Sequence, residues 1–366
     1  MRVMIKTAAA ASIAAVLAAC GSATSTPNAN GTSPASTAPA ATSKFKACMV
    51  TDTGGIDDRS FNASSYQGLK DAKTANSNIS ITYLPSTSGT DYTPNINTFI
   101  AHKCGIIVTV GFLMGTATQT AAKANPNQKF AIVDYTYSPA VSNIDALVFN
   151  TLQDAFQGGY LAAGMTKTGT VATFGGQQFG TVTIYMDGFY DGVQYYNQRH
   201  GTHVKVLGWN EATQKGSFTG NFTDQTKGLT LTNTFINAGA DIIFPVAGNV
   251  GLGAAKAVQT ADQAGRKVNM FWVDTDGCVS APQYCQYFIT SVQKGIASAV
   301  KAAVLSAAGG TFKGGNYLGT LTNAGVGLAP FHDFASKVPA SLKAELAQIA
   351  TQLENGTIKP KTKSPA

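Results

Sequence analysis

Short apolar runs alternate along this chain with longer stretches in which apolar residues recur at helical spacing. In the first half, the runs cover residues 47–51, 79–84, 105–110, 130–135 and 146–150, and the helical stretches cover residues 61–75, 93–102 and 115–124. Continuous apolar runs predict strands buried on both faces, and strand–helix alternation predicts a parallel sheet with right-handed crossovers. A strand order of 2-1-3-4-5 would be typical of such a sheet.

The same pattern repeats in the second half of the chain. Strand-like runs cover residues 170–175, 204–209, 241–246 and 268–274, separated by helical stretches at residues 184–200, 224–238 and 250–264. Two α/β lobes of similar build are therefore expected, with several crossings between them that form a hinge. We expect the run at 286–292 and the helix after it to return to the first lobe, and the run at 325–330 to return to the second. The predicted lobes are residues 44–150 plus about 278–322, and residues 151–277 plus about 323–366.

Residues 1–20 have the pattern of a bacterial lipoprotein signal peptide. Arg2 and Lys6 precede a short apolar segment that ends in the sequence LAAC, so that Cys20 would become the lipidated first residue. An ordinary signal peptide with a chance cysteine is the alternative. Residues 21–43 consist mostly of Ser, Thr, Ala, Pro, Asn and Gly, which predicts a flexible tether. The folded part would then lie at the cell membrane, lipid-anchored and facing the extracytoplasmic side.

Composition narrows the class of protein further. The 366 residues carry a formal net charge of +7, but the Lys and Arg residues are scattered along the chain. A solvated basic surface is therefore expected, with no nucleic acid as partner.

The cysteines other than Cys20 form an even set of four. An even set in an exported protein predicts disulfides, with Cys278 paired to Cys285 across a short loop and Cys48 left to pair with Cys104. A zinc site is the alternative, although the chain has no C-x-x-C motif and only four histidines.

Polar residues gather where the predicted strands end, which is where open α/β sheets bind ligands. Asp52, Gly111 and Asp134 follow strands of the first lobe, and Gly248 and Asp274 follow strands of the second. This recurrence predicts a ligand site between the lobes.

One stretch, VTDTGGIDDRSFNASSYQGLKDA at residues 50–72, allows two interpretations. Asp57 and Asp58 could simply cap the helix that follows. Alternatively, a carboxylate here binds a vicinal diol, the amide of Asn62 binds a heteroaromatic edge, and Tyr66 offers a flat face for stacking.

The sequence offers little support for an enzyme. It has no G-x-S-x-G elbow and no P-loop, and GNVGLGAAK at residues 248–256 is only a weak match to a dinucleotide fingerprint. We expect no catalytic residues, no cofactor and no metal.

Several motifs together resemble those of the basic membrane protein family of ABC-transporter substrate-binding lipoproteins, which includes purine nucleoside receptors. They are the stretch beginning at residue 50, GFLMG, FAIVDY, GGYLAAG, GSFTGNFTDQTKG, DIIFPVAGNVGLGAAKA, WVDTD and ITSVQKG, and they span residues 45 to 330 in order. The resemblance implies a type I periplasmic-binding-protein fold, with two Rossmann-like lobes that close on a ligand.

The resemblance also implies a set of ligand-binding residues. Asp57 and Asn62 would bind ribose and base, Tyr66 and Phe222 would sandwich the base, and Gly248 would let the backbone approach the ligand. Further polar contacts would come from Asp134, Asp276 and Lys294. The family often has a glutamine after WVDTD, where this chain has Gly277 and a cysteine-bounded insertion, so Asp274 is an alternative to Asp276.

The implied function is capture of a nucleoside, with delivery to the permease and ATPase subunits of an importer by a monomeric binding protein. A sugar or another small polar molecule is an alternative ligand. A ligand-sensing envelope lipoprotein, or an adhesin that presents its surface to a protein partner, is an alternative of a different class.

Overall fold

The computed structural model describes residues 44–364, which form two α/β lobes, each built on a six-stranded sheet. The predicted signal peptide, the lipidation site Cys20 and the tether lie outside the described residues. Within the described part of the chain, no helix is both long enough and apolar enough to cross a bilayer.

The sheet of the first lobe has the order β2-β1-β3-β4-β5-β13, with every neighbouring pair parallel. This confirms the predicted order 2-1-3-4-5. The strands are β1 (Phe45–Thr51), β2 (Ile79–Leu84), β3 (Ile106–Val110), β4 (Phe130–Val133), β5 (Ile144–Phe149) and β13 (Gly315–Gly319). Every residue of β3 and β4 is buried, as continuous apolar runs predict.

Helices cover both faces of this sheet. Helices α1 (Phe61–Ala75) and α9 (Ile296–Ala308) pack on one face, and α2 (Tyr92–Ala101) and α3 (Gly115–Ala124) pack on the other. The short 3₁₀ helices η1 (Gly89–Asp91) and η2 (Phe112–Met114) lead into α2 and α3. Cys48 of β1 is joined by a disulfide to Cys104, with 6.0 Å between the Cα atoms. This is the pairing expected from the sequence.

The sheet of the second lobe repeats the same order as β7-β6-β10-β11-β12-β14, and only the last strand is antiparallel. Its strands are β6 (Thr170–Gly175), β7 (Lys205–Leu207), β10 (Ile242–Val246), β11 (Asn269–Asp274), β12 (Phe288–Lys294) and β14 (Val326–Leu328). A small hairpin, β8 (Trp209–Asn210) with β9 (Lys215–Gly216), follows β7.

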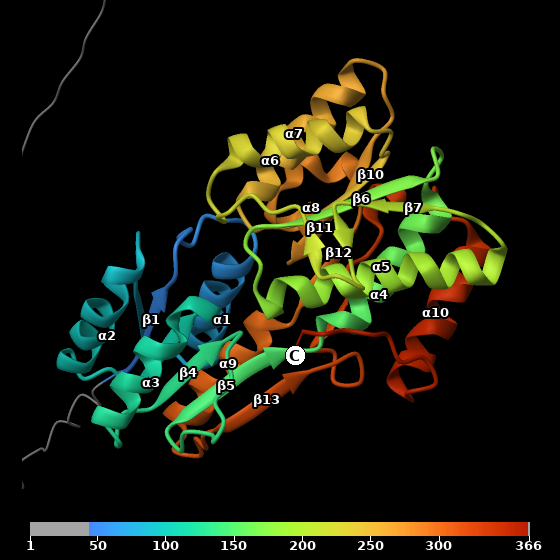
Figure 1. The fold of residues 1–366 in the computed structure, drawn as a ribbon. Helices are drawn as coiled ribbons and strands as arrows, with labels where there is room; N and C mark the ends of the chain where they lie inside the picture. The colour runs from blue at the N-terminus through green and yellow to red at the C-terminus, as the bar shows by residue number, and fades with distance from the viewer. Residues whose placement is uncertain (1–43, 365–366) are drawn as a thin grey trace, which may run out of the picture. The chain divides into compact units, whose positions relative to one another are not determined.

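Helices again cover both faces (Figure 1). One face carries α4 (Thr151–Met165), α5 (Gly180–His200) and α10 (Ala340–Glu354), and the other carries α6 (Gln225–Asn237) and α7 (Val250–Gln263). Three short helices complete the lobe: α8 (Gly277–Ser280), η3 (Pro282–Tyr287) and η4 (His332–Phe334). The sequence pattern did not predict α4, because most of its residues are buried and no polar stripe marks its helical period.

The predicted return of residues 278–294 to the first lobe is wrong. β12 pairs in parallel with β11 and so belongs to the second sheet, and the chain crosses to the first lobe only at Gly295, just before α9. An apolar run such as β12 fits the interior of either sheet, and its partner is decided by long-range pairing that periodicity does not contain.

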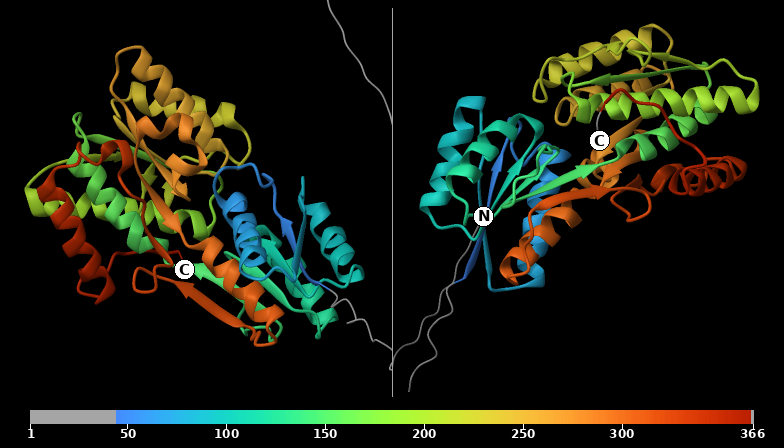
Figure 2. Two further views of the ribbon diagram at one scale, coloured as in Figure 1. Left: turned by 180° about the vertical axis from the view of Figure 1, so that it is seen from behind. Right: turned by 60° about the horizontal axis from the view of Figure 1, so that its bottom comes forward.

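The chain crosses between the lobes three times, after β5, after β12 and after β13. Figures 1 and 2 show β13 running beside β5, although the two strands are far apart in sequence. The crossings are joined by backbone hydrogen bonds, from Asn150 N–H to Gly319 O (2.8 Å) and from Gly295 N–H to Gly325 O (2.8 Å). Three adjoining segments therefore form the predicted hinge.

Candidate ligand site between the lobes

The fourth strand of each sheet, counted along the chain, ends in an aspartate with the same unusual backbone. Asp134 follows β4 and Asp274 ends β11, and both have φ of +65°, in the left-handed region that few non-glycine residues adopt. Both side chains are buried. Strained residues at strand ends of open sheets are typical of functional sites.

Lys294, at the end of β12, links these two aspartates. Its Nζ lies 2.5 Å from Asp134 Oδ2 and 3.9 Å from Asp274 Oδ1, and its side chain is only 4% exposed. The ammonium group also lies 5.2 Å from the ring centres of Phe61 and Tyr185, which come from different lobes. A buried lysine is stable here because carboxylates and aromatic rings replace its water.

The loop before α1 carries the next part of the site. Asp58 accepts hydrogen bonds from the backbone N–H groups of Ser60 (3.0 Å), Asn62 (2.8 Å) and Ala63 (2.9 Å), which have no partner within the helix. Asp58 is therefore the cap of α1, as one of the two interpretations expected. Ser60 donates from Oγ to Asp274 Oδ2 across the lobes (2.7 Å).

Asn62 and Asp52 form a buried polar pair beside the cap. Asn62 Nδ2 donates to Asp52 Oδ1 over 3.0 Å, while Asn62 Oδ1 is buried and has no partner among the described residues. Gly111 makes room for Asp52: it has φ of +113°, and a Cβ at this position would lie 2.1 Å from Asp52 Oδ2. An unpaired buried amide oxygen costs stability unless a ligand donates to it.

Burial shifts the protonation of these acids. It raises the pKa of Asp52 to about 8, although the hydrogen bond from Asn62 lowers that pKa in part and the neighbouring Asp58 raises it further. Burial also raises the pKa of Asp58 to about 6, opposed by its three backbone donors. The pKa of Asp134 is raised by burial and lowered by Lys294. At neutral pH the site therefore contains carboxyl groups in both protonation states.

These residues surround a cavity between the lobes with about 640 Å³ of unoccupied space, including the part that opens to solvent. Aromatic rings line it from both sides: Phe61 and Phe112 from the first lobe, and Phe179, Tyr185 and Phe222 from the second. Phe112 and Phe179 stack across the lobes with 5.1 Å between ring centres.

Six of the nine ligand-binding residues predicted from the sequence line this cavity. They are Asn62, Asp134, Phe222, Gly248, Asp274 and Lys294. Gly248 has φ of +53°, and a Cβ at this position would lie 3.9 Å from the carbonyl oxygen of Phe222, its nearest contact among the described residues. A side chain there would project toward the cavity.

The structure places Asp57 and Tyr66 outside the cavity. Asp57 is exposed to solvent, and its neighbour Asp58 points inward instead. Tyr66 packs on Tyr83 with 5.0 Å between ring centres and contacts the core of the first lobe. The physical reason is that α1 runs away from the sheet edge, so only its first turn faces the cavity and Phe61 takes the place predicted for Tyr66.

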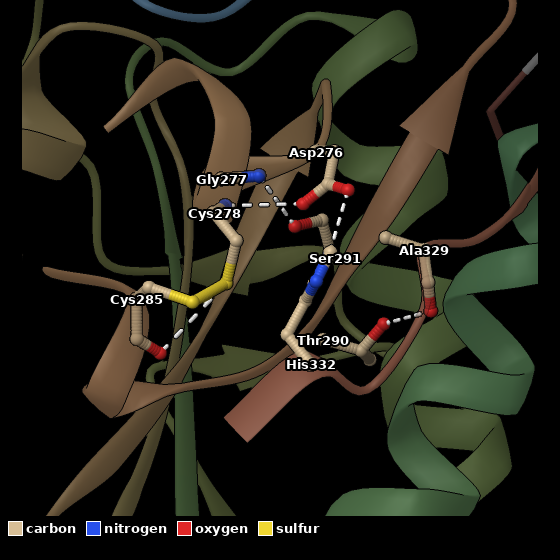
Figure 3. The surroundings of a disulfide bond; sticks show 8 residues. All are labelled: Asp276, Gly277, Cys278, Cys285, Thr290, Ser291, Ala329 and His332. Atoms are coloured by element: carbon tan, nitrogen blue, oxygen red, sulfur yellow. Dashed lines mark hydrogen bonds and ion pairs between the residues drawn. A yellow bond between two sulfur atoms is a disulfide. The ribbon is translucent and has the colours of Figure 1, made fainter. Parts of the chain in front are cut away.

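Asp276 also lies outside the cavity, and Asp274 is the residue that lines it. Asp276 caps α8 through the N–H of Cys278 (3.0 Å) and contacts His332 Nε2 (2.7 Å). Cys278 is joined to Cys285 by a disulfide, as the sequence analysis expected (Figure 3). Two residues after a strand end, the chain has already turned away from the cleft.

Sequence reasoning missed Phe61, Phe179 and Tyr185. Phe61 could have been found from its place next to Asn62 at the first turn of a helix that follows a strand. Tyr185 had no such signal, because it lies inside α5 and reaches the site by donating its hydroxyl to Asp274 Oδ1 (3.0 Å). Phe179 lies in the loop before α5, and only the tertiary structure places it in the cavity lining, stacked on Phe112.

Comparison with known proteins decides the family. A family model described as ABC transporter substrate-binding protein PnrA-like (Bmp) matches residues 45–366. The chain belongs to this family. The predicted resemblance is therefore confirmed, and this Bmp-family chain is a substrate-binding protein of an ABC transporter, a class that binds ligands and is not a class of enzymes.

Two named relatives match most of the chain. The chain is 29% identical over 327 residues to the ABC transporter nucleoside-binding protein BmpA of Lactococcus lactis subsp. cremoris, covering 86% of this chain and 88% of that protein. It is 30% identical over 329 residues to the CD4+ T-cell-stimulating antigen of Listeria monocytogenes, covering 86% and 87%.

The fold prediction is confirmed as well. An ABC transporter solute-binding protein from Aeropyrum pernix K1 superposes with a TM-score of 0.77 at 23% identity, covering 86% of this chain and 92% of that chain. The two lobes of parallel sheets are those of a type I periplasmic-binding protein.

Proposed function

We propose that this Bmp-family protein captures a nucleoside, with purine nucleosides as the preferred class, in the cavity between its lobes and delivers it to a membrane permease. The observation that carries the proposal is the combination of buried hydrogen-bond acceptors and aromatic rings in one cavity between the lobes. Among the described residues, Asn62 Oδ1 has no partner, and the buried carboxyl groups of Asp52, Asp134 and Asp274 line the same space. The name of the relative BmpA supports the same ligand class.

The chemistry of a nucleoside matches this lining. Carboxylates accept hydrogen bonds from ribose hydroxyls, and an amide accepts from a base N–H while its NH₂ donates. A protonated Asp52 would add a donor for a ring nitrogen, since its pKa is raised to about 8. Phe61 and Phe222 come from opposite lobes and offer flat faces for the base.

Charge favours a nucleoside over a nucleotide. Among the described residues that line the cavity, the single ammonium group is that of Lys294, which already contacts Asp134. Asp58 and Asp274 add further carboxyl groups, while Asp52 is largely protonated at neutral pH because burial raises its pKa to about 8. A phosphate would face like charges, which costs several kcal/mol at a buried site. We expect nucleoside monophosphates to bind about 100-fold more weakly than nucleosides, or worse, on this basis.

Capture would work by closure of the lobes about the three-segment hinge. A ligand that contacts both lobes at once stabilises the closed state, because the open state can make only one set of contacts. The closed form would then dock on the permease, whose ATPase subunit drives import. We propose a monomer held at the extracytoplasmic face of the membrane through lipid on Cys20, with residues 21–43 as the tether.

Calorimetry and thermal shift on the purified protein test the ligand class. The probes are adenosine, guanosine, inosine, cytidine, uridine, their free bases, ribose, other sugars, and the matching monophosphates. A nucleoside at about 100 times its Kd should raise the unfolding free energy by about 2.7 kcal/mol. The protein is first unfolded and refolded to remove any carried ligand.

The outcomes separate the alternatives. Stabilisation by nucleosides but not monophosphates supports the proposal. Stabilisation by sugars alone would replace the nucleoside with a sugar, and no stabilisation by any probe would favour a sensor or an adhesin. For the lipid anchor, Cys20→Ser should release the protein from membranes, and unchanged membrane retention would contradict that part.

A further inference from the structure

A cluster of potential metal ligands lies outside the ligand cavity, at the disulfide that follows β11 (Figure 3). Asp276, Cys278 and His332 each offer one ligand atom, and these atoms all lie within 4.8 Å of one another. Cys285 is not a member of this group, but its sulfur lies next to it because it is bonded to that of Cys278. No histidine is near Cys278 or Cys285 along the chain, but folding brings His332 beside Cys278.

The backbone that carries these side chains is held firmly on both sides. Gly277 N–H donates to Ser291 Oγ (2.9 Å), which fixes the start of α8 on β12. On the other side, Thr290 Oγ1 donates to Ala329 O (2.6 Å) and fixes the segment that leads to His332. The imidazole of His332 is already directed at Asp276, with 2.7 Å between Nε2 and Oδ2. Such preorganisation is what a metal site requires.

Two thiolates, one imidazole and one carboxylate form a donor set that suits Zn²⁺. Zinc sites are tetrahedral, with bonds of about 2.3 Å to sulfur and about 2.0–2.2 Å to nitrogen or oxygen. Bonds of these lengths place the ligand atoms about 3.3–3.8 Å apart, so the 2.7 Å pair of His332 and Asp276 would open to admit the metal while the sulfur atoms approach it. With the disulfide intact, the sulfurs are not thiolates and the zinc ligand set is incomplete.

We propose that reduction of the Cys278–Cys285 disulfide converts this cluster into a zinc site, with Asp276, Cys278, Cys285 and His332 as ligands. A dithiol supplies the two electrons: it becomes a cyclic disulfide, and Cys278 and Cys285 each gain a proton. Zn²⁺ then displaces both thiol protons and binds the two thiolates, the neutral imidazole and the carboxylate. In the reverse direction, a small-molecule disulfide accepts the two electrons and becomes two thiols, the Cys278–Cys285 bond forms again, and Zn²⁺ is released because its two thiolate ligands are lost.

The two disulfides differ in their access to a reductant. Cys48 and Cys104 are buried in the first lobe, with exposed fractions of 0% and 4%. Cys278 and Cys285 are half-buried near the surface. Thiol–disulfide exchange requires access to a sulfur atom, so the Cys278–Cys285 bond reacts first.

Cobalt titration of the full chain tests the site, because Co²⁺ bound by thiolates shows visible d–d bands and a charge-transfer band in the near ultraviolet. The protein is treated with dithiothreitol, desalted without oxygen and titrated with Co²⁺, then with Zn²⁺. We expect one Co²⁺ per chain with a thiolate band, and loss of that band as Zn²⁺ displaces it. The oxidised protein should show no thiolate band.

Variants locate the ligands. His332→Ala should weaken Co²⁺ binding at least tenfold, whereas His203→Ala, at another exposed histidine, should leave it unchanged. Cys278→Ser with Cys285→Ser should abolish the thiolate band, and circular dichroism checks that each reduced protein stays folded. Absence of the band in reduced protein that is still folded would overturn the proposal, as would full affinity in His332→Ala. If reduction unfolds the chain and Zn²⁺ does not restore the fold, the proposal is also wrong.

Discussion

The two lobes have the same strand order but contribute different chemistry to the cavity. Both end their fourth strand in an aspartate with φ of +65°, Asp134 in the first lobe and Asp274 in the second. Around this shared feature, the first lobe adds the acids Asp52 and Asp58, while the second adds Lys294 and most of the aromatic rings. A repeated scaffold therefore fixes where side chains gather, and the local sequence of each lobe decides what they can bind.

The largest expected loss of stability comes from removing Lys294, the cation that Asp134 and Asp274 share. Lys294→Met leaves buried carboxylates without their cation, and removing one partner of a buried pair costs about 3–5 kcal/mol of unfolding free energy. Urea denaturation measures the loss. Lys267→Met, at an exposed ion pair with Asp262, is the control and should cause no measurable change. If both variants are equally stable, the contacts of Lys294 with Asp134 and Asp274 do not stabilise the folded protein.

Asp52, an acid of the first lobe only, should make the free energy of unfolding depend on pH. The pKa of Asp52 is about 8 in the folded protein against an ordinary value of 3.8, so between these values the folded state binds more protons than the unfolded state. Stability then falls as pH rises, by about 2–4 kcal/mol between about pH 5 and pH 8, on the scale of about 1.4 kcal/mol per pKa unit.

Asp52→Asn should flatten this dependence, because it removes the titrating group but keeps an oxygen that can accept from Asn62. Urea denaturation at several pH values measures the slope in both proteins. Asp58 contributes in the same direction at lower pH, since burial raises its pKa to about 6, so some slope below pH 6 remains in the variant. An unchanged slope at higher pH would assign the effect to another group.

The glycines after β3 and β10 should respond differently to the same substitution. Gly111→Ala places a Cβ against Asp52 and should cost about 1–3 kcal/mol of stability from overpacking, beyond backbone strain. Gly248→Ala meets almost no protein atoms, so it should cost only the backbone strain of a non-glycine residue at φ of +53°, about 1 kcal/mol, and should also weaken ligand binding. Chemical denaturation and calorimetry on both variants separate the two effects, and a reversed pattern would contradict the geometry.

Phe61 and Tyr66 both lie on α1, so substituting each in turn compares an aromatic ring inside the cavity with one outside it. Phe61→Ala should weaken nucleoside binding by about 1–3 kcal/mol, which is the range for base–aromatic stacking, and Phe222→Ala in the other lobe should do the same. Tyr66→Ala, one turn along α1 and outside the cavity, should leave the affinity unchanged. A larger loss in Tyr66→Ala than in Phe61→Ala, measured by calorimetry, would restore the prediction made from the sequence.

The sequence by itself determined most of the strands, the family and the strand-end residues Asp134 and Asp274, and it suggested the order of five strands in the first sheet, but it did not indicate β13. These features depend on local patterns, because burial on both faces gives continuous apolar runs and parallel strands bring their carboxyl ends to one edge. Family motifs added Asn62, Phe222 and Lys294, which line the cavity in the structure.

Only the tertiary structure decided which side chains meet. It placed Phe61 at the cavity in preference to Tyr66, because the direction of α1 sets which turn faces the cleft. It assigned β12 to the second sheet, because strand pairing is a long-range choice among equally apolar edges. It also brought His332 beside Cys278 and Asp276, a contact between segments separated by β12, α9 and β13. Periodicity describes one element at a time, whereas a site is made of contacts between elements.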